Sequence, residues 1–116
     1  MSFTIKIRKV DNVVIMDLSG KLTIGEPVIQ LRDTLRGQVA EGNLKIIVNL
    51  ADVSYVDSSG LGELVSSYTT VRGKGGDIKL LKLTAKIKDL LQMTKLLTVF
   101  EVFDDEGKGL GSFKDK

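Results

Sequence analysis

The feature that most constrains the fold is the run LKIIVNL at residues 44–50, which is apolar and rich in β-branched residues. A short continuous run of this kind predicts a strand that is covered on both faces. Leu61, Leu64, Val65 and Tyr68 follow at the i, i+3, i+4, i+7 spacing of an amphipathic helix, and we expect them to face the core. A buried strand followed by a helix is typical of α/β proteins, in which helices connect parallel strands.

The rest of the chain continues this alternation. Apolar and polar residues alternate on both sides of a turn signal at Asp11 and Asn12, which predicts an opening hairpin of residues 3–8 and 13–20. Periodicity and glycine or proline boundaries predict further helices and strands, namely helices over 27–41 and 87–95 and strands over 77–83 and 98–103. The expected fold class is α/β, with a mixed, mainly parallel β-sheet and helices mainly on one face.

Length and composition suit one domain over residues 1–116, since 42% of the 116 residues are hydrophobic. The C-terminal segment KGLGSFKDK, 108–116, is expected to be a solvated tail, with weak order from about residue 104. The net charge of +2 comes from interleaved acids and bases, which does not favour a nucleic-acid partner. No segment has the pattern of a signal peptide or the length of a membrane span, so we expect no membrane partner and a cytoplasmic location.

The chain has no cysteine and no histidine. This excludes disulfides, thiolate nucleophiles and histidine-dependent triads, and it removes the usual ligands of zinc. The glycine-rich segment at 73–76 lacks the G-x-x-x-x-G-K-[ST] pattern and follows a predicted helix, so it is interpreted as a turn. We therefore expect no cofactor, no metal and no catalytic residue.

The segment DSSGLG, 57–62, joins the buried strand to the following helix and allows two interpretations. In the first, Asp57, Ser58 and Ser59 cap the helix, whose first N–H groups lack partners. In the second, a serine there is a phosphorylation switch, because it is accessible to a kinase and the helix start tolerates the added charge of about −1.5 to −2. A catalytic serine is less favoured, because no histidine exists and no lysine is near in sequence.

At these residues the sequence resembles the STAS family, named for sulfate transporters and anti-sigma factor antagonists. The resemblance covers nearly the whole chain and rests on three segments: GKLT at 20–23, LKIIVNLADVSYVDSSGLGEL at 44–64 and GGDIKLLKLTAKIKDLLQMTKL at 75–96. The stand-alone bacterial antagonists are the members most similar to it.

The resemblance implies a regulatory protein that acts by partner switching rather than an enzyme. The unphosphorylated domain would bind an anti-sigma factor that is also a serine kinase, and this would free the sigma factor. Phosphorylation of the serine after the aspartate, here Ser58, would dissociate the complex, and a serine/threonine phosphatase would restore the binding form. Many antagonists carry an aspartate at the position of Thr23, and the nearby Glu26 could supply a carboxylate instead.

The expected partner surface combines the loop around Thr23 and Glu26 with the turn and with exposed positions of the helix. The turn and helix residues assigned to it are Asp57, Ser58, Ser59, Gly60, Glu63 and Ser67.

Two alternatives stay open. The chain could be a scaffold subunit of a stressosome or of a lipid-transport complex, or it could be a small enzyme or nucleotide-binding protein.

Overall fold

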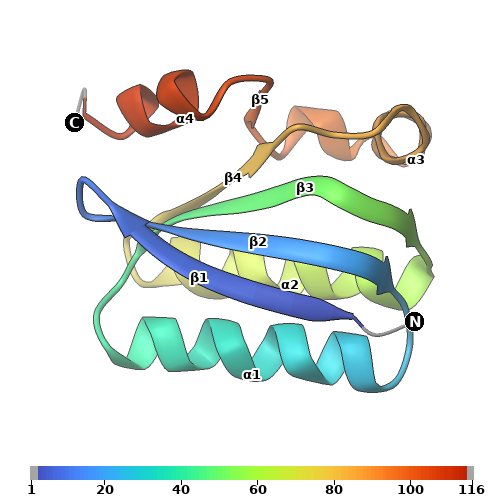
Figure 1. The fold of residues 1–116 in the computed structure, drawn as a ribbon, viewed down its shortest axis with the longest axis horizontal. Helices are drawn as coiled ribbons and strands as arrows, with labels where there is room; N and C mark the ends of the chain where they lie inside the picture. Colours follow the sequence, from blue (N-terminus) through green and yellow to red (C-terminus); the bar gives the residue numbers. More distant parts are fainter. Residues whose placement is uncertain (1–2, 115–116) are drawn as a thin grey trace.

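The structure is a computed structural model that describes residues 3–114 (Figure 1). Within that range a five-stranded sheet has the strand order β1-β2-β3-β4-β5. The strands are β1 (Thr4–Val10), β2 (Val13–Leu22), β3 (Lys45–Val56), β4 (Asp77–Leu81) and β5 (Val102–Phe103). β1 and β2 pair antiparallel, whereas β2–β3, β3–β4 and β4–β5 are parallel. The predicted mixed, mainly parallel sheet is confirmed.

The opening hairpin is confirmed together with its turn. Asp11 and Asn12 have φ values of 51° and 69°, and Val10 pairs with Val13 across them. Positive φ at both central residues is the mark of a type I′ turn, whose twist matches that of the strands it joins. The short polar side chains of aspartate and asparagine tolerate this conformation better than most residues do.

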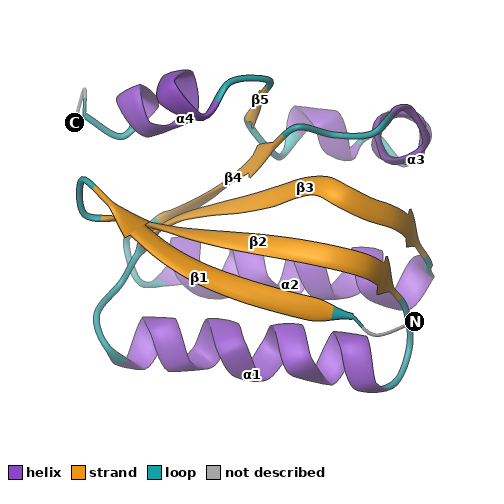
Figure 2. Ribbon diagram, in the orientation of Figure 1, coloured by secondary structure: helices purple, strands orange, loops and turns teal. Residues whose placement is uncertain are grey.

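Most of the helical structure covers one face of the sheet. α1 (Glu26–Ala40) and α2 (Ser58–Gly73) lie side by side beneath it (Figures 1 and 2). α3 (Ala85–Met93) adds Ile87 and Leu91 to the same core. The sheet residues in this core include Val14, Met16, Leu18, Ile46, Val48, Leu50, Ile78 and Leu80. Helices mainly on one face were predicted, and this is confirmed.

The opposite face of the sheet carries α4 (Glu106–Ser112). A second apolar cluster lies there, made of Val13, Ile15, Ile47, Leu81 and Phe113. Phe113 is only 5% exposed, so the expectation of a solvated C-terminal tail is wrong for the described residues. The reason is that β2 and β3 are apolar on both faces, and α4 with Phe113 covers the second face. Residues 115 and 116 lie outside the described part of the chain.

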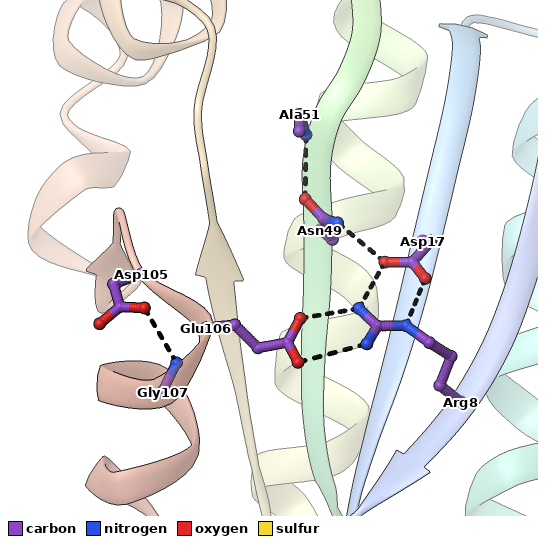
Figure 3. A network of polar contacts seen from close by, with 7 residues as sticks. All are labelled: Arg8, Asp17, Asn49, Ala51, Asp105, Glu106 and Gly107. Carbon is purple, nitrogen blue, oxygen red and sulfur yellow. Dashed lines mark hydrogen bonds and ion pairs between the residues drawn. The ribbon is translucent and has the colours of Figure 1, made fainter.

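A polar network also joins α4 to the sheet (Figure 3). Arg8 Nε donates to Asp17 Oδ2 at 2.6 Å, and Arg8 Nη2 donates to Glu106 Oε1 at 2.9 Å. Asn49 Nδ2 donates to Asp17 Oδ1 at 2.8 Å. The hydrogen bond from Arg8 holds the pKa of Asp17 below its usual range. Three neighbouring strands and α4 are thereby linked on the face opposite α1 and α2.

The strand boundaries differ most from the prediction in β3 and β5. β3 continues past Leu50 to Val56, because register shifts against β2 break its alternation: Ala51 and Asp52 are both exposed, whereas Val53 is buried. The predicted strand 98–103 is wrong over residues 98–101.

That stretch begins in the short 3-10 helix η1 (Leu96–Thr98), and only Val102–Phe103 forms a strand. Phe100 between them is buried and meets the ring of Tyr68 edge-on at 5.1 Å. Tertiary packing has thus overridden the strand pattern.

The predicted helices are all present, with boundaries shifted by one or two residues. α2 ends at Gly73, as the glycine-rich segment predicts. No helix within residues 3–114 combines the length and the apolar character needed to cross a membrane.

Candidate functional site

β3 leads directly into α2 at the end of the sheet where the parallel strands finish. Asp57 has extended backbone (φ −91°, ψ −177°), and α2 begins at Ser58. Asp57 Oδ1 accepts a hydrogen bond from the amide of Gly60 at 2.8 Å. This is an N-cap, which gives one of the unpaired N–H groups of the helix an acceptor. The capping interpretation is therefore confirmed for Asp57.

The second oxygen of Asp57 braces a different segment. Asp57 Oδ2 accepts from the amide of Ile24 at 2.9 Å, in the loop between β2 and α1. The hydrogen bond from Ile24, and then the one from Gly60, hold the pKa of Asp57 below its usual value of 3.8. A negative charge is consequently fixed next to Ser58 at neutral pH, and both oxygens that hold it are already engaged.

Gly60 lets the start of α2 approach the end of β2. A Cβ at this position would lie 2.2 Å from the backbone oxygen of Leu22, closer than real Cβ contacts come. The same oxygen of Leu22 accepts from the amide of Asp57 at 3.2 Å. Gly60 is buried, so it positions the turn and offers no side chain to a partner.

Ser58 and Ser59 differ in accessibility. Ser58 is the first residue of α2 and is exposed, whereas Ser59 is half-buried. An exposed hydroxyl on a turn braced by three hydrogen bonds is presented in a fixed place to an incoming protein. A nucleophile would also need a base within reach, and the nearest carboxylate in sequence, Asp57, is fully occupied by backbone amides.

The loop between β2 and α1 lies beside this turn because Asp57 holds it there. Thr23 is half-buried, and Glu26 is exposed at the start of α1. Ile24 lies between them and is 74% exposed. The structure thus brings Thr23 and Glu26 to the same end of the molecule as Ser58, as the sequence predicts, and adds an exposed apolar side chain.

A groove of about 390 Å³ lies on the other side of the turn, between the end of β3 and α3. Its lining includes Asp57 and Ser58 as well as Lys86, Asp89 and Leu90 of α3. Tyr55 and Met93, which are 48% and 82% exposed, line it too. These two side chains and Ile24, on the loop held by Asp57, make up the apolar rim of the site.

The expectation that Glu63 and Ser67 are exposed is wrong. They are 7% and 3% exposed, and Glu63 accepts hydrogen bonds from Arg32 of α1, the shorter of them 2.9 Å from Nη2. The physical reason is that α1 packs along this side of α2. The buried face of α2 is therefore wider than the stripe of apolar residues that its sequence shows. Of the predicted core residues only Leu64 is fully buried, whereas Leu61, Val65 and Tyr68 are partly buried against the core.

Sequence reasoning missed the whole contribution of α3 to the site. Lys86 and Met93 are far from the DSSGLG segment in the chain, and no periodic signal relates them to it. Tyr55 carried a weak signal, because it is an aromatic residue only two positions before the segment.

These features define a class of protein: a compact α/β domain that presents an exposed serine on a braced helix start, with exposed apolar side chains around it. Residues 4–109 match the family model of the STAS domain, and the chain belongs to the STAS family. The predicted resemblance is confirmed.

Three relatives illustrate the match. The chain is 28% identical over 102 residues to an anti-sigma-B factor antagonist of Bacillus subtilis, covering 88% of this chain and 92% of that one. It is 26% identical to an anti-sigma F factor antagonist of Paenibacillus polymyxa, covering 95% and 94%. The solved structure of the Bacillus cell fate determinant SpoIIAA in its phosphorylated form has a TM-score of 0.74 at 21% identity, covering 97% and 99%. That last likeness concerns the fold.

Proposed function

We propose that this protein is an anti-sigma factor antagonist that acts by partner switching, with Ser58 as its phosphorylated residue. The observation that carries the proposal is the exposure of Ser58 at the first position of α2, on a turn held by Asp57. The names of the relatives from Bacillus subtilis and Paenibacillus polymyxa support it. The protein is a ligand and a substrate in this scheme, not an enzyme, and it acts in the cytoplasm.

In the unphosphorylated state, the turn and its surroundings bind an anti-sigma factor that is a serine kinase. The polar contacts come from Thr23, Glu26 and Ser59, while Asp57 holds the turn and the neighbouring loop in place. The apolar rim supplies the anchors, since exposed aromatic and methionine side chains are enriched in the centres of interfaces. Glu63, Ser67 and Gly60 are buried and act only by shaping the turn.

The switch step is a phosphoryl transfer. The kinase moves the γ-phosphoryl group of ATP to Ser58 Oγ, the bond to ADP breaks, and the hydroxyl proton is lost. The new group carries about −1.5 to −2 charges and lies next to Asp57, whose own charge is fixed. Like-charge contacts at an interface cost several kcal/mol, and each 1.4 kcal/mol is a factor of ten in affinity. A serine/threonine phosphatase hydrolyses the phosphoserine and restores the binding form.

The test uses purified protein and anti-sigma factor kinases from the source genome, starting with any encoded beside this gene. After incubation with ATP, mass spectrometry should place phosphate on Ser58. Calorimetry with the kinase that modifies the protein should show that Ser58→Ala binds and is not released by ATP, while Ser58→Asp binds roughly 100-fold to 1000-fold more weakly. Ser59→Ala is the matched control: it should still be phosphorylated on Ser58 and released by ATP, and its affinity for the kinase should fall far less than that of Ser58→Asp. Phosphate found only on Ser59, or on neither serine, overturns the proposal.

A second pair of variants tests the apolar rim. Met93→Ala should weaken kinase binding by about tenfold or more, as truncation of an interface anchor does. Ile7→Ala removes an apolar side chain on β1 that is 41% exposed and does not line the groove, so it should leave binding unchanged. Equal affinities for the two variants would remove the rim from the partner surface.

A further inference from the structure

The groove beside Ser58 contains one cation whose position is not explained by fold stability. Charged side chains in its lining are Asp57 from the start of α2, and Lys86 and Asp89 from α3. Lys86 is exposed in the first turn of α3, where the helix dipole disfavours a positive charge. The ion pairs within residues 3–114 do not include Lys86.

The surrounding groups leave Lys86 free to act on something else. The carboxylate of Asp57 is taken up by the amides of Gly60 and Ile24. The cap of α3 is supplied by Thr84, whose Oγ1 accepts from the amide of Ile87 at 3.4 Å. A lysine ammonium on a flexible four-carbon stem can therefore turn toward a new anion without breaking any ion pair within residues 3–114.

We propose that Lys86 is the intrachain partner of the phosphoryl group on Ser58, a role that rests on the proposed function of Ser58. Phosphorylation adds about two negative charges to a groove that already holds Asp57 and Asp89. Lys86 is the cation of that groove, and it offsets part of this repulsion within the chain.

The ion pair has a consequence for the switch. It draws the start of α3 toward the start of α2 and places charge in the groove that the apolar side chains of Tyr55 and Met93 line. The phosphorylated form would then lose its partner for two reasons, the negative charge itself and the occupied groove.

The experiment measures the second ionisation of the phosphate directly. Phosphoserine is installed at position 58 during translation by an expanded genetic code, so no kinase is needed. The ³¹P chemical shift is followed from about pH 4 to pH 9 in four proteins: the parent, Lys86→Met, Lys86→Arg and Lys88→Met. Lys88 is an exposed lysine of the same helix that does not line the groove.

A nearby cation favours the dianion and lowers the phosphate pKa. A unit charge about 4 Å away in water corresponds to roughly 0.7 of a pH unit. We expect the measured pKa to rise by about that amount in Lys86→Met, to stay at the parent value in Lys88→Met, and to remain low in Lys86→Arg, which keeps the charge. Added salt should shrink the difference between the parent and Lys86→Met.

Equal phosphate pKa values in the parent and in Lys86→Met overturn the inference. A rise of the same size in Lys88→Met does so too, because it shows a general effect of net charge. This outcome is separable from failure of the proposed function. If no kinase modifies Ser58 but the titration depends on Lys86, the regulatory role fails and the pairing stands. If the kinase acts on Ser58 but Lys86→Met leaves the phosphate pKa unchanged, the pairing with Lys86 fails and the proposed function of Ser58 stands.

Discussion

Replacement of Gly60 by alanine tests the close approach that builds the site. The added Cβ would lie 2.2 Å from the backbone oxygen of Leu22 and 2.9 Å from its Cγ. The leucine side chain could rotate away, but the oxygen belongs to the end of β2 and also accepts the amide of Asp57. Either the start of α2 or the end of β2 must therefore move.

The magnitude follows from two opposing terms. Overpacking a well-packed region costs about 1–3 kcal/mol, and a clash with backbone belongs at the upper end of that range. Alanine also has a higher helix propensity than glycine, which stabilises the helix by about 1 kcal/mol. We expect Gly60→Ala to lower the free energy of unfolding by about 2 kcal/mol.

Gly62→Ala is the matched control in the same helix. A Cβ at Gly62 would meet nothing within 4 Å, so only the propensity term remains, and the variant should gain about 1 kcal/mol. The two substitutions are chemically identical, yet their unfolding free energies should differ by about 3 kcal/mol.

Urea denaturation followed by circular dichroism measures both values, with the slope m checked for constancy. The amide resonance of Ile24 reports whether Asp57 still holds the neighbouring loop. If Gly60→Ala proves as stable as Gly62→Ala and leaves that resonance in place, the close approach does not constrain the turn, and the reasoning about the site is refuted.

Three further predictions concern the cap, the switch residue and the C-terminal helix. The lowered pKa of Asp57 means that its stabilising contribution is present above pH 3.8 and is lost as the pH falls through the lower native pKa. Asp57→Asn should accordingly be less stable than the wild type at neutral pH, and the difference in unfolding free energy should narrow as the pH falls below 3.8. Urea denaturation at a series of acidic pH values measures this difference, and a difference independent of pH would contradict the prediction. Ser58→Asp should change the free energy of unfolding by about 1 kcal/mol or less in either direction, because Ser58 is exposed at a helix start and the dipole offsets repulsion from Asp57; a loss of several kcal/mol in the same assay would make Ser58 a structural residue. Phe113→Ala should cost about 3 kcal/mol because the ring is buried against β2 and β3, and wild-type stability would mean that α4 does not close the second face.

Much of the fold could be predicted because its signals are local. The hairpin turn at Asp11 and Asn12, the start of α2 and its end at Gly73 each depend on residues adjacent in sequence. The cap at Asp57 belongs to the same group. β3 was predicted too short because its register shifts against β2 are a property of the pair, not of the strand. The C-terminal segment was misjudged because nothing near Phe113 in the sequence shows that the second face of the sheet needs a cover.

The sequence by itself determined the order of strands and helices as far as β5 and the place of an exposed serine at a helix start. Periodicity, turn residues and capping act over a few positions, so they can be recognised without knowledge of the fold. Only the tertiary structure decided which side of α2 is buried, because Glu63 and Ser67 are polar and their burial comes from the packing of α1. It also decided what surrounds Ser58: the loop held by Asp57, the apolar rim and Lys86 come from separate segments, and they meet because parallel strands end at one edge of the sheet.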